Sequence, residues 1–234
     1  MTGDADMTPR NDFAGAREWV PEQPSLAALR EAVQQCRGCD LYRDATQAVM
    51  GSGEPRAALA LLGEQPGDRE DVAGEPFVGP AGKVLDRALA DAGIDPEDTY
   101  VTNAVKHFRF ERRGKQRIHK SPSRGHVAAC EPWLAAELEV VGPQGVVVLG
   151  GTAGKALFGS GFKVGERRGR LLDWPTETYA VPTPPAWVLA TIHPSAVLRG
   201  EEREELYAGL VADLRVAADA LGPRLATGEV GSQS

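Results

Sequence analysis

Three polar side chains that could take part in catalysis each follow a short apolar segment of the sequence: Glu64, Asn103 and His193. An aromatic residue, Phe77, lies in a Pro- and Gly-rich segment between the first two. Taken singly, each has an ordinary structural explanation as a turn residue, a strand cap or a core ring. If the apolar segments are parallel strands, however, all of these side chains meet at one edge of a sheet, where such sheets bind their ligands.

This set of side chains is suited to a planar heterocycle. Phe77 could stack on the face of a ring, Asn103 could match a donor and an acceptor on its edge, and His193 could hydrogen-bond an anion that develops on a ring oxygen. Cleavage of an N-glycosidic bond needs this help, because negative charge develops on the departing base while the sugar becomes cationic. A carboxylate at Glu64 would stabilise that sugar or orient its attacker.

The elements that must position these residues are short strands that alternate with helices. The expected strands are 57–62, 100–102, 145–149 and 187–191, and the expected helices are 26–35, 83–92, 126–141, 152–157 and 201–221. A long polar loop precedes the helix at 126. Such alternation predicts a parallel sheet that is covered on both faces. The predicted fold class is therefore α/β, a three-layer α/β/α sandwich with a central, mostly parallel four-stranded sheet.

Both ends of the chain lack this periodicity. Residues 1–24 and 222–234 are predicted to be disordered tails around a single domain of residues 25–221. The acidic start, without an apolar stretch behind it, predicts that no secretory signal is present. No run of 18 apolar residues occurs, so we expect no transmembrane helix and a cytoplasmic location, associated with the nucleoid through DNA.

The chain has three cysteines, Cys36, Cys39 and Cys130, an odd number that cannot form a closed set of disulfides. The first two form a C-x-x-C motif, which is typical of a redox pair, a zinc site or an iron–sulfur cluster. A redox pair is expected between a strand and a helix, whereas this motif follows an amphipathic helical segment. The context therefore favours metal ligation over redox catalysis.

Four segments resemble the motifs of the uracil-DNA glycosylase superfamily: Gly63–Gly67, Pro76–Gly82, Thr102–Asn103 and His193–Ser195. The resemblance extends from about residue 36 to about residue 214, and within the superfamily it is to the iron–sulfur branch, specifically the UdgX type. It implies the same sandwich fold and excision of uracil from DNA. The catalytic residues that it implies are Glu64, His119 and His193. The uracil-binding residues that it implies are Gln65, Asp68, Phe77, Asn103 and His193.

The basic segment 112–121 carries the second part of this resemblance. UdgX proteins have an inserted basic loop that ends in Arg-Ile-His, here Arg117–His119, although Gln116 stands where the family commonly has Arg. The resemblance implies that His119 attacks the sugar C1′ after uracil leaves, so that the protein stays bound to the DNA and reacts essentially once. It also implies a set of DNA-binding residues: Lys115, Arg117, Lys120, Ser195 and Arg199.

Two other functions are also compatible with the sequence. One is a turnover glycosylase that releases both uracil and abasic DNA. The other is a non-catalytic, metal-stabilised module that binds single-stranded DNA, which would leave Glu64, Asn103 and His193 without a role.

The cysteines also fit the resemblance to the iron–sulfur branch of the superfamily. The iron–sulfur branch has four Cys ligands, and His107 follows Lys106 at the place of the third. The resemblance therefore implies a [4Fe-4S] cluster held by Cys36, Cys39, His107 and Cys130. Zinc bound by three Cys and one His remains compatible with the residue types.

The overall composition of the chain is ordinary, but its charge is unevenly distributed. The 234 residues carry a net charge of −7, with 42% hydrophobic and 25% charged residues, which is typical of a globular protein and excludes a coiled coil or a fibre. Between Lys106 and Arg124, however, eight basic residues face one acidic residue, a local charge of +7 against −14 for the rest. This distribution predicts a DNA partner. Single-stranded uracil-containing DNA is the expected preference, because base extrusion costs least there. We also expect a monomer without a membrane partner.

Overall fold

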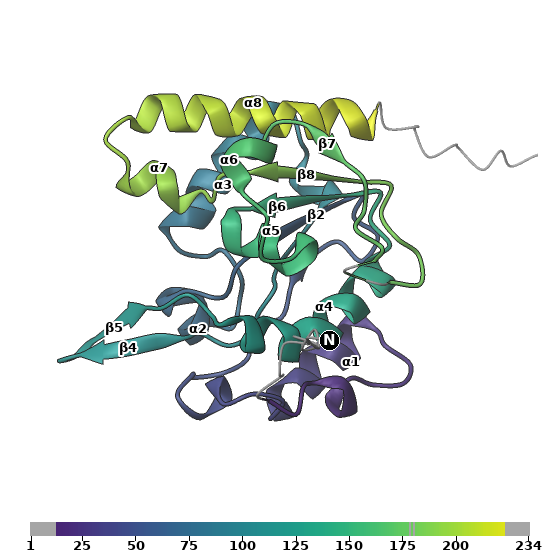
Figure 1. Cartoon of the computed structure of the whole chain (residues 1–234), viewed down its shortest axis with the longest axis vertical. Helices are drawn as coiled ribbons and strands as arrows, with labels where there is room; N and C mark the ends of the chain where they lie inside the picture. The colour runs from purple at the N-terminus through teal and green to yellow at the C-terminus, as the bar shows by residue number, and fades with distance from the viewer. Residues whose placement is uncertain (1–12, 178, 180, 223–234) are drawn as a thin grey trace, which may run out of the picture.

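The computed structural model describes residues 13–177, 179 and 181–222. The domain is built on a six-stranded sheet in the order β1-β3-β2-β6-β8-β7 (Figure 1). Its strands are β1 (Ser52–Gly53), β2 (Leu59–Gly63), β3 (Thr99–Asn103), β6 (Gly145–Leu149), β7 (Leu171–Leu172) and β8 (Trp187–Thr191). The four central strands are parallel, and the two-residue edge strands β1 and β7 are antiparallel to their neighbours. The predicted parallel core is confirmed; the edge strands are too short to produce a sequence pattern.

Helices cover both faces of the sheet. They are α1 (Leu26–Ala32), α2 (Asp68–Ala73), α3 (Pro80–Ala92), α4 (Arg124–Val141), α5 (Gly151–Phe158), α6 (Val164–Arg167), α7 (Ser195–Arg199) and α8 (Arg203–Leu221). Every residue of β2 is buried, and its side chains alternate between two cores. Leu59 and Leu61 pack with α3 and α8, whereas Ala60 and Leu62 pack with α4 and α5. The predicted three-layer α/β/α sandwich is therefore confirmed (Figure 1).

A smaller apolar cluster joins the start of the domain to α4. It contains Leu29 of α1, Cys36, Cys130 and Trp133, with Ala16 buried against them. Four short 3-10 turns occur in the described chain: Arg17–Trp19, Val33–Gln35, Leu41–Arg43 and Pro96–Asp98. The prediction of a disordered tail up to residue 24 was therefore wrong from residue 13 onward, because burial of Ala16 attaches this segment to the domain. Residues 1–12 and 223–234 of the predicted tails lie outside the described residues.

The predicted polar loop before α4 is instead a β-hairpin, which projects from the body of the domain (Figure 1). Strand β4 (Phe110–Arg113) pairs antiparallel with β5 (Gln116–His119), and Phe110 faces His119 at the base of the hairpin. Gly114 has a φ of 59° in the two-residue turn, a conformation that favours glycine. The hairpin thus presents His119 from a paired strand.

None of the helices in the described part of the chain is long and apolar enough to cross a membrane.

Candidate active site at the carboxyl ends of the strands

A cleft of about 600 Å³ opens at the carboxyl ends of the parallel strands. Predicted site residues from distant parts of the chain line it together: Glu64, Gln65, Phe77, Asn103, His119, His193, Ser195 and Arg199. They come from the ends of β2, β3, β5 and β8, from the two ends of α7 and from the loop before α3. The expectation that these side chains meet at one edge of the sheet is confirmed.

Close approach at the end of β2 brings two of these side chains together. Gly63 pairs with Asn103 in the parallel register of β2 and β3. A Cβ atom on Gly63 would collide with the Asn103 Oδ1 atom and lie 2.7 Å from the Phe77 ring. Glycine is therefore required here, because a larger residue would displace both the carboxamide and the aromatic ring from the cleft.

Phe77 has a backbone conformation that is rare for a residue with a side chain. Its φ is 57°, in the left-handed region. A Cβ atom on Gly82 of α3 would collide with the Phe77 carbonyl oxygen, so this conformation depends on a glycine in the following helix. The result places the Phe77 ring 6.1 Å from the His193 ring, with the two rings 28° from parallel. Strain of this kind persists where the surrounding structure enforces it, often at a ligand site.

The hydrogen bonds of His193 define its tautomer. The Ser195 backbone N–H donates to Nδ1 at 3.1 Å, and the Ser195 hydroxyl lies 2.7 Å from the same atom. Nδ1 is therefore an acceptor, and the ring proton of the neutral imidazole is on Nε2. Burial, assisted by the charges of Arg199 and His119, lowers the pKa of His193 to about 4. The side chain is thus a neutral donor at physiological pH.

Glu64 and His119 meet at the mouth of the cleft. The Oε1 atom of Glu64 lies 3.7 Å from the Nε2 atom of His119. This oxygen is buried and accepts no hydrogen bond within the described chain, which is costly for a carboxylate. His119, in contrast, is about half exposed (49% of its side chain) and accessible to a large substrate. The pair therefore combines a carboxylate oxygen that lacks a hydrogen bond within the described chain with an accessible imidazole.

Arg117 holds the hairpin to α2 instead of facing solvent. Its Nη1 atom lies 2.5 Å from Asp71, its Nε atom lies 2.5 Å from Asp68, and the guanidinium stacks on Phe108 and Phe110. The Asp71 side chain is fully buried. Arg117 was predicted to bind DNA, but its guanidinium is already occupied by carboxylates. Asp68 was predicted to bind uracil, but it does not line the cleft.

Gln65 makes a second attachment at the base of the hairpin. Its Nε2 atom donates to the backbone oxygens of Arg109 and Lys120, both at 3.1 Å, and its Oε1 atom accepts from the Arg109 N–H at 3.0 Å. These backbone groups flank the two strands of the hairpin. The Gln65 side-chain amide therefore positions the hairpin, and because Gln65 also lines the cleft, its predicted contact with uracil stays a prediction.

Of the remaining predicted DNA-binding residues, Ser195 and Arg199 line the cleft, whereas Lys115 and Lys120 belong to the hairpin segment. Lys115 is exposed in the hairpin turn, Lys120 pairs with Glu111 at 2.9 Å, and Ser195 and Arg199 lie on α7 beside His193. Their roles at DNA stay predictions.

Glu70 lines the cleft from α2 but was not among the predicted site residues. Its Oε1 atom accepts a hydrogen bond from the Gly79 N–H at 2.8 Å. A Cβ atom on either Gly67 or Gly79 would lie within 3 Å of the Glu70 carboxylate. These two glycines, at the end of Gly63–Gly67 and within Pro76–Gly82, were a signal in the sequence that some side chain packs closely against them.

The three cysteines lie near one another beside α4. The Cys36 sulfur accepts hydrogen bonds from the Gly38 N–H at 3.5 Å and the Trp133 indole at 3.3 Å, and the Cys130 sulfur accepts one from the Lys106 N–H at 3.3 Å. Burial raises the pKa of Cys39 to about 11 and that of Cys130 to about 12, and repulsion among the sulfurs adds to both shifts. No group of three Cys, His, Asp or Glu side chains in the described residues is arranged to hold a metal ion.

Two buried histidines lie close to these cysteines, and their hydrogen bonds differ. His126 uses both ring nitrogens: Nδ1 accepts from the Ser123 N–H at 3.0 Å, and Nε2 lies 2.9 Å from an Asp40 oxygen. The ring of His107 makes no hydrogen bond within the described chain. Burial, together with the charge of Arg37, lowers the pKa of His107 to about 4, which keeps the imidazole in the neutral form that metals bind.

Residues 50–215 match the family model of the uracil DNA glycosylase superfamily. The chain belongs to this superfamily. A type-4 uracil-DNA glycosylase from Thermotoga maritima is 35% identical over 181 residues, which cover 76% of this chain and 86% of that protein. A type-4 uracil-DNA glycosylase from Pyrobaculum aerophilum is 34% identical over 176 residues, which cover 74% of this chain and 85% of that protein.

The superfamily match contains the whole cleft, from Glu64 to Arg199, and also the hairpin. Cys36 and Cys39 precede the matched residues. The superfamily is thus established, whereas the assignment to the UdgX type rests on the residues of the hairpin and stays a prediction.

The tautomer of His193 leads to a direct spectroscopic prediction. We expect its imidazole to titrate with a midpoint near pH 4 and to carry its proton on Nε2 from pH 5 to 8. Two-dimensional ¹H–¹⁵N spectra of the histidine side chains, assigned with a His193→Gln variant, measure both properties. A midpoint close to the unperturbed value of about 6.5 would contradict this assignment.

The same shift affects stability. The unfolded chain binds a proton at His193 below about pH 6.5, whereas the folded state resists it down to about pH 4. The free energy of unfolding is therefore not affected by this residue above pH 6.5, and it falls as the pH decreases from about 6.5 to about 4.

Proposed function

We propose that this protein excises uracil from DNA and then traps the resulting abasic sugar covalently on His119. The contact between Glu64 and His119 carries the proposal, because it places an accessible nucleophile beside a carboxylate within the same cleft as Phe77, Asn103 and His193. Membership of the superfamily and the names of its type-4 relatives support the first step. The hairpin geometry supports the second.

The side chains of the cleft divide the first step among them. Phe77 stacks on the flipped uracil, and the Asn103 carboxamide hydrogen-bonds its edge. The His193 Nε2–H then donates to the uracil oxygen on which negative charge develops as the glycosidic bond breaks. A neutral donor is suited to this task, because its proton is already in place and its orientation is held by Ser195.

The second step forms a bond to the protein. As the C1′–N1 bond breaks, its electron pair leaves with uracil and the sugar becomes an oxocarbenium ion. An unprotonated ring nitrogen of His119 then donates its lone pair to C1′, which converts the imidazole to a cation. Glu64 lies beside this charge and stabilises it. Because the imidazole is held close to C1′, it competes with water through its high effective concentration.

Two alternatives differ from this proposal in defined ways. A turnover glycosylase would use the same cleft but pass the sugar to water, as the names of the type-4 relatives suggest for them. A non-catalytic module that binds single-stranded DNA would not need Glu64, Asn103 and His193 to converge, so the cleft argues against it. Single-stranded DNA remains the preferred substrate of our proposal, because base extrusion costs least there.

His119→Ser separates trapping from turnover. We expect wild-type protein and a uracil-containing oligonucleotide to give a protein–DNA band on a denaturing gel, and the variant to give none while releasing uracil over several turnovers. The same oligonucleotide with thymine in place of uracil is the control. Repeated uracil release by the wild type, without a stable band, would show that the turnover alternative is correct.

Arg117→Gln tests the attachment of the hairpin. Loss of the guanidinium leaves buried Asp71 without its cation, so we expect the rate of crosslinking to fall roughly 10- to 100-fold as His119 loses its position. Arg113→Gln is the matched control, since it removes the same charge from the exposed part of the same hairpin, where 70% of the Arg113 side chain is accessible. Crosslinking rates are measured on gels, per folded protein.

If Arg117→Gln does not fold, the double variant Arg117→Gln/Asp71→Asn removes both charges and tests the same attachment. Crosslinking by a folded variant of either kind at the rate of the Arg113→Gln control would contradict a positioning role for Arg117.

We further propose a [4Fe-4S] cluster held by Cys36, Cys39, Cys130 and His107. The proposal is supported by the residue types and their surroundings, although the side chains are not arranged around a metal position in the described chain. The three thiols belong to one apolar cluster, two of their sulfurs accept N–H hydrogen bonds, and His107 is buried. Such hydrogen bonds are common around clusters. The cluster would stabilise this region, because the proposed chemistry transfers no electrons.

The cluster proposal predicts a brown protein that contains about four iron atoms per chain. We expect His107→Cys to keep the visible absorption and the iron, because it restores a fourth thiolate, and His107→Ala to lose both. Elemental analysis together with visible spectra measures these outcomes. A colourless wild-type protein that contains one zinc per chain would show that the zinc alternative is correct.

A further inference from the structure

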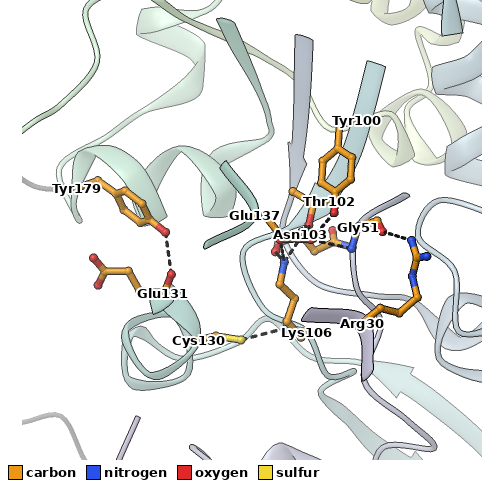
Figure 2. Close-up of polar contacts among 10 residues, drawn as sticks. All are labelled: Arg30, Gly51, Tyr100, Thr102, Asn103, Lys106, Cys130, Glu131, Glu137 and Tyr179. Atoms are coloured by element: carbon orange, nitrogen blue, oxygen red, sulfur yellow. Dashed lines mark hydrogen bonds and ion pairs between the residues drawn. The ribbon is translucent and has the colours of Figure 1, made fainter. Parts of the chain in front are cut away.

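A pair of opposite charges lies in the interior of the domain, between β3 and α4 (Figure 2). Lys106 follows the end of β3, and Glu137 belongs to α4. Both side chains are fully buried, and the Lys106 Nζ atom forms an ion pair with Glu137 Oε2. Lys106 therefore does not belong to the DNA-facing charge of the basic segment, to which the sequence assigned it.

Every donor of the buried ammonium group has an acceptor. Besides Glu137, Nζ donates to the Thr102 hydroxyl and to the backbone oxygen of Asn103, both at 2.8 Å. Glu137 Oε1 accepts from the Gly51 N–H at 2.8 Å and from the Tyr100 hydroxyl at 2.9 Å. Well-packed apolar residues often replace such a pair without loss of stability, so a buried ion pair by itself does not explain its presence. Its geometry suggests a role in orientation.

The network ends at a residue of the cleft. Asn103 is the last residue of β3, and its side chain lines the cleft while its backbone oxygen accepts from Lys106. Lys106 is in turn attached to α4 at two places, through its side chain to Glu137 and through its backbone N–H to the Cys130 sulfur. Cys130 and Glu137 are seven residues apart, which places them on one face of the helix, two turns from each other.

We propose that Lys106 is a positioning residue for uracil recognition. By holding the Asn103 backbone oxygen, with Glu137 as its anchor on α4, it fixes the direction in which the Asn103 carboxamide enters the cleft. The inference rests on the proposed function, in which Asn103 hydrogen-bonds the edge of uracil. It predicts that loss of the pair slows base excision without weakening the initial binding of DNA, since DNA first contacts the exposed hairpin.

The double variant Lys106→Met/Glu137→Gln removes both charges with little change in volume and leaves an amide oxygen for Gly51 and Tyr100. We expect its single-turnover rate of uracil release at saturating DNA to fall roughly 10- to 100-fold, with the DNA concentration for half-maximal rate unchanged within about twofold. Tyr100→Phe is the matched control, because it removes a hydrogen bond from the same buried carboxylate without touching Asn103. It should keep the wild-type rate.

A double-mutant cycle shows whether Lys106 acts through Asn103. We expect Asn103→Ala to lower the rate much less in the double variant than in the wild type, because the carboxamide is already misplaced there. An equal fold-loss in both backgrounds, or a wild-type rate in the double variant, overturns the inference. A wild-type protein that releases no uracil contradicts the proposed function instead.

Thermal unfolding establishes that each variant is folded. If the double variant is not, Thr102→Val removes one of the three Lys106 acceptors, together with a hydrogen bond to Glu137, and leaves both charges of the ion pair in place. The same cycle is then run with this variant. A smaller loss of rate that disappears in the Asn103→Ala background supports the inference, and an unchanged rate or an additive loss overturns it.

Discussion

The attachment of the β4–β5 hairpin to α2 and to Gln65 is the constraint on which the proposed chemistry depends. His119 is the last residue of β5, and a hairpin that projects from the domain has little packing of its own to hold it. Arg117 supplies the missing order through a carboxylate, Asp71, that is itself fully buried. Breaking one side of such a pair costs about 3–5 kcal/mol, so the hairpin has a strong preference for one position. Gln65 restricts its base by hydrogen bonds to both strands' flanking residues.

The side chains of the cleft are already held in defined positions in the free protein. Phe77 is held in a left-handed conformation, His193 is kept neutral with its proton on Nε2, and Glu64 has a buried oxygen that no donor reaches within the described chain. Each is unfavourable or restrictive in the free protein, yet each is suited to a reaction in which the base becomes an anion and the sugar a cation. Electrostatic groups fixed in advance need no reorganisation as these charges develop.

The sequence predicted the central sheet and the convergence of Glu64, Asn103 and His193, because buried parallel strands have a clear apolar pattern and their carboxyl ends share one edge. It could not predict the partners of the basic segment. Arg117 pairs with carboxylates 46 and 49 residues away, and Lys106 with one 31 residues away. Such contacts leave no local pattern in the sequence, so Lys106 and Arg117 were both counted among the basic residues that face DNA. In the structure, Arg117 attaches the hairpin to α2, and Lys106 is buried against Glu137.

Mass spectrometry can locate the bond that joins His119 to the abasic sugar. Wild-type protein is allowed to react with a uracil-containing oligonucleotide, the DNA is trimmed by nuclease, and the protein is digested for tandem mass spectrometry. We expect the mass of the abasic sugar and its remaining phosphates to be attached to the imidazole of His119, at close to one adduct per chain. An unmodified His119 together with released uracil, or an adduct on another residue, would contradict it.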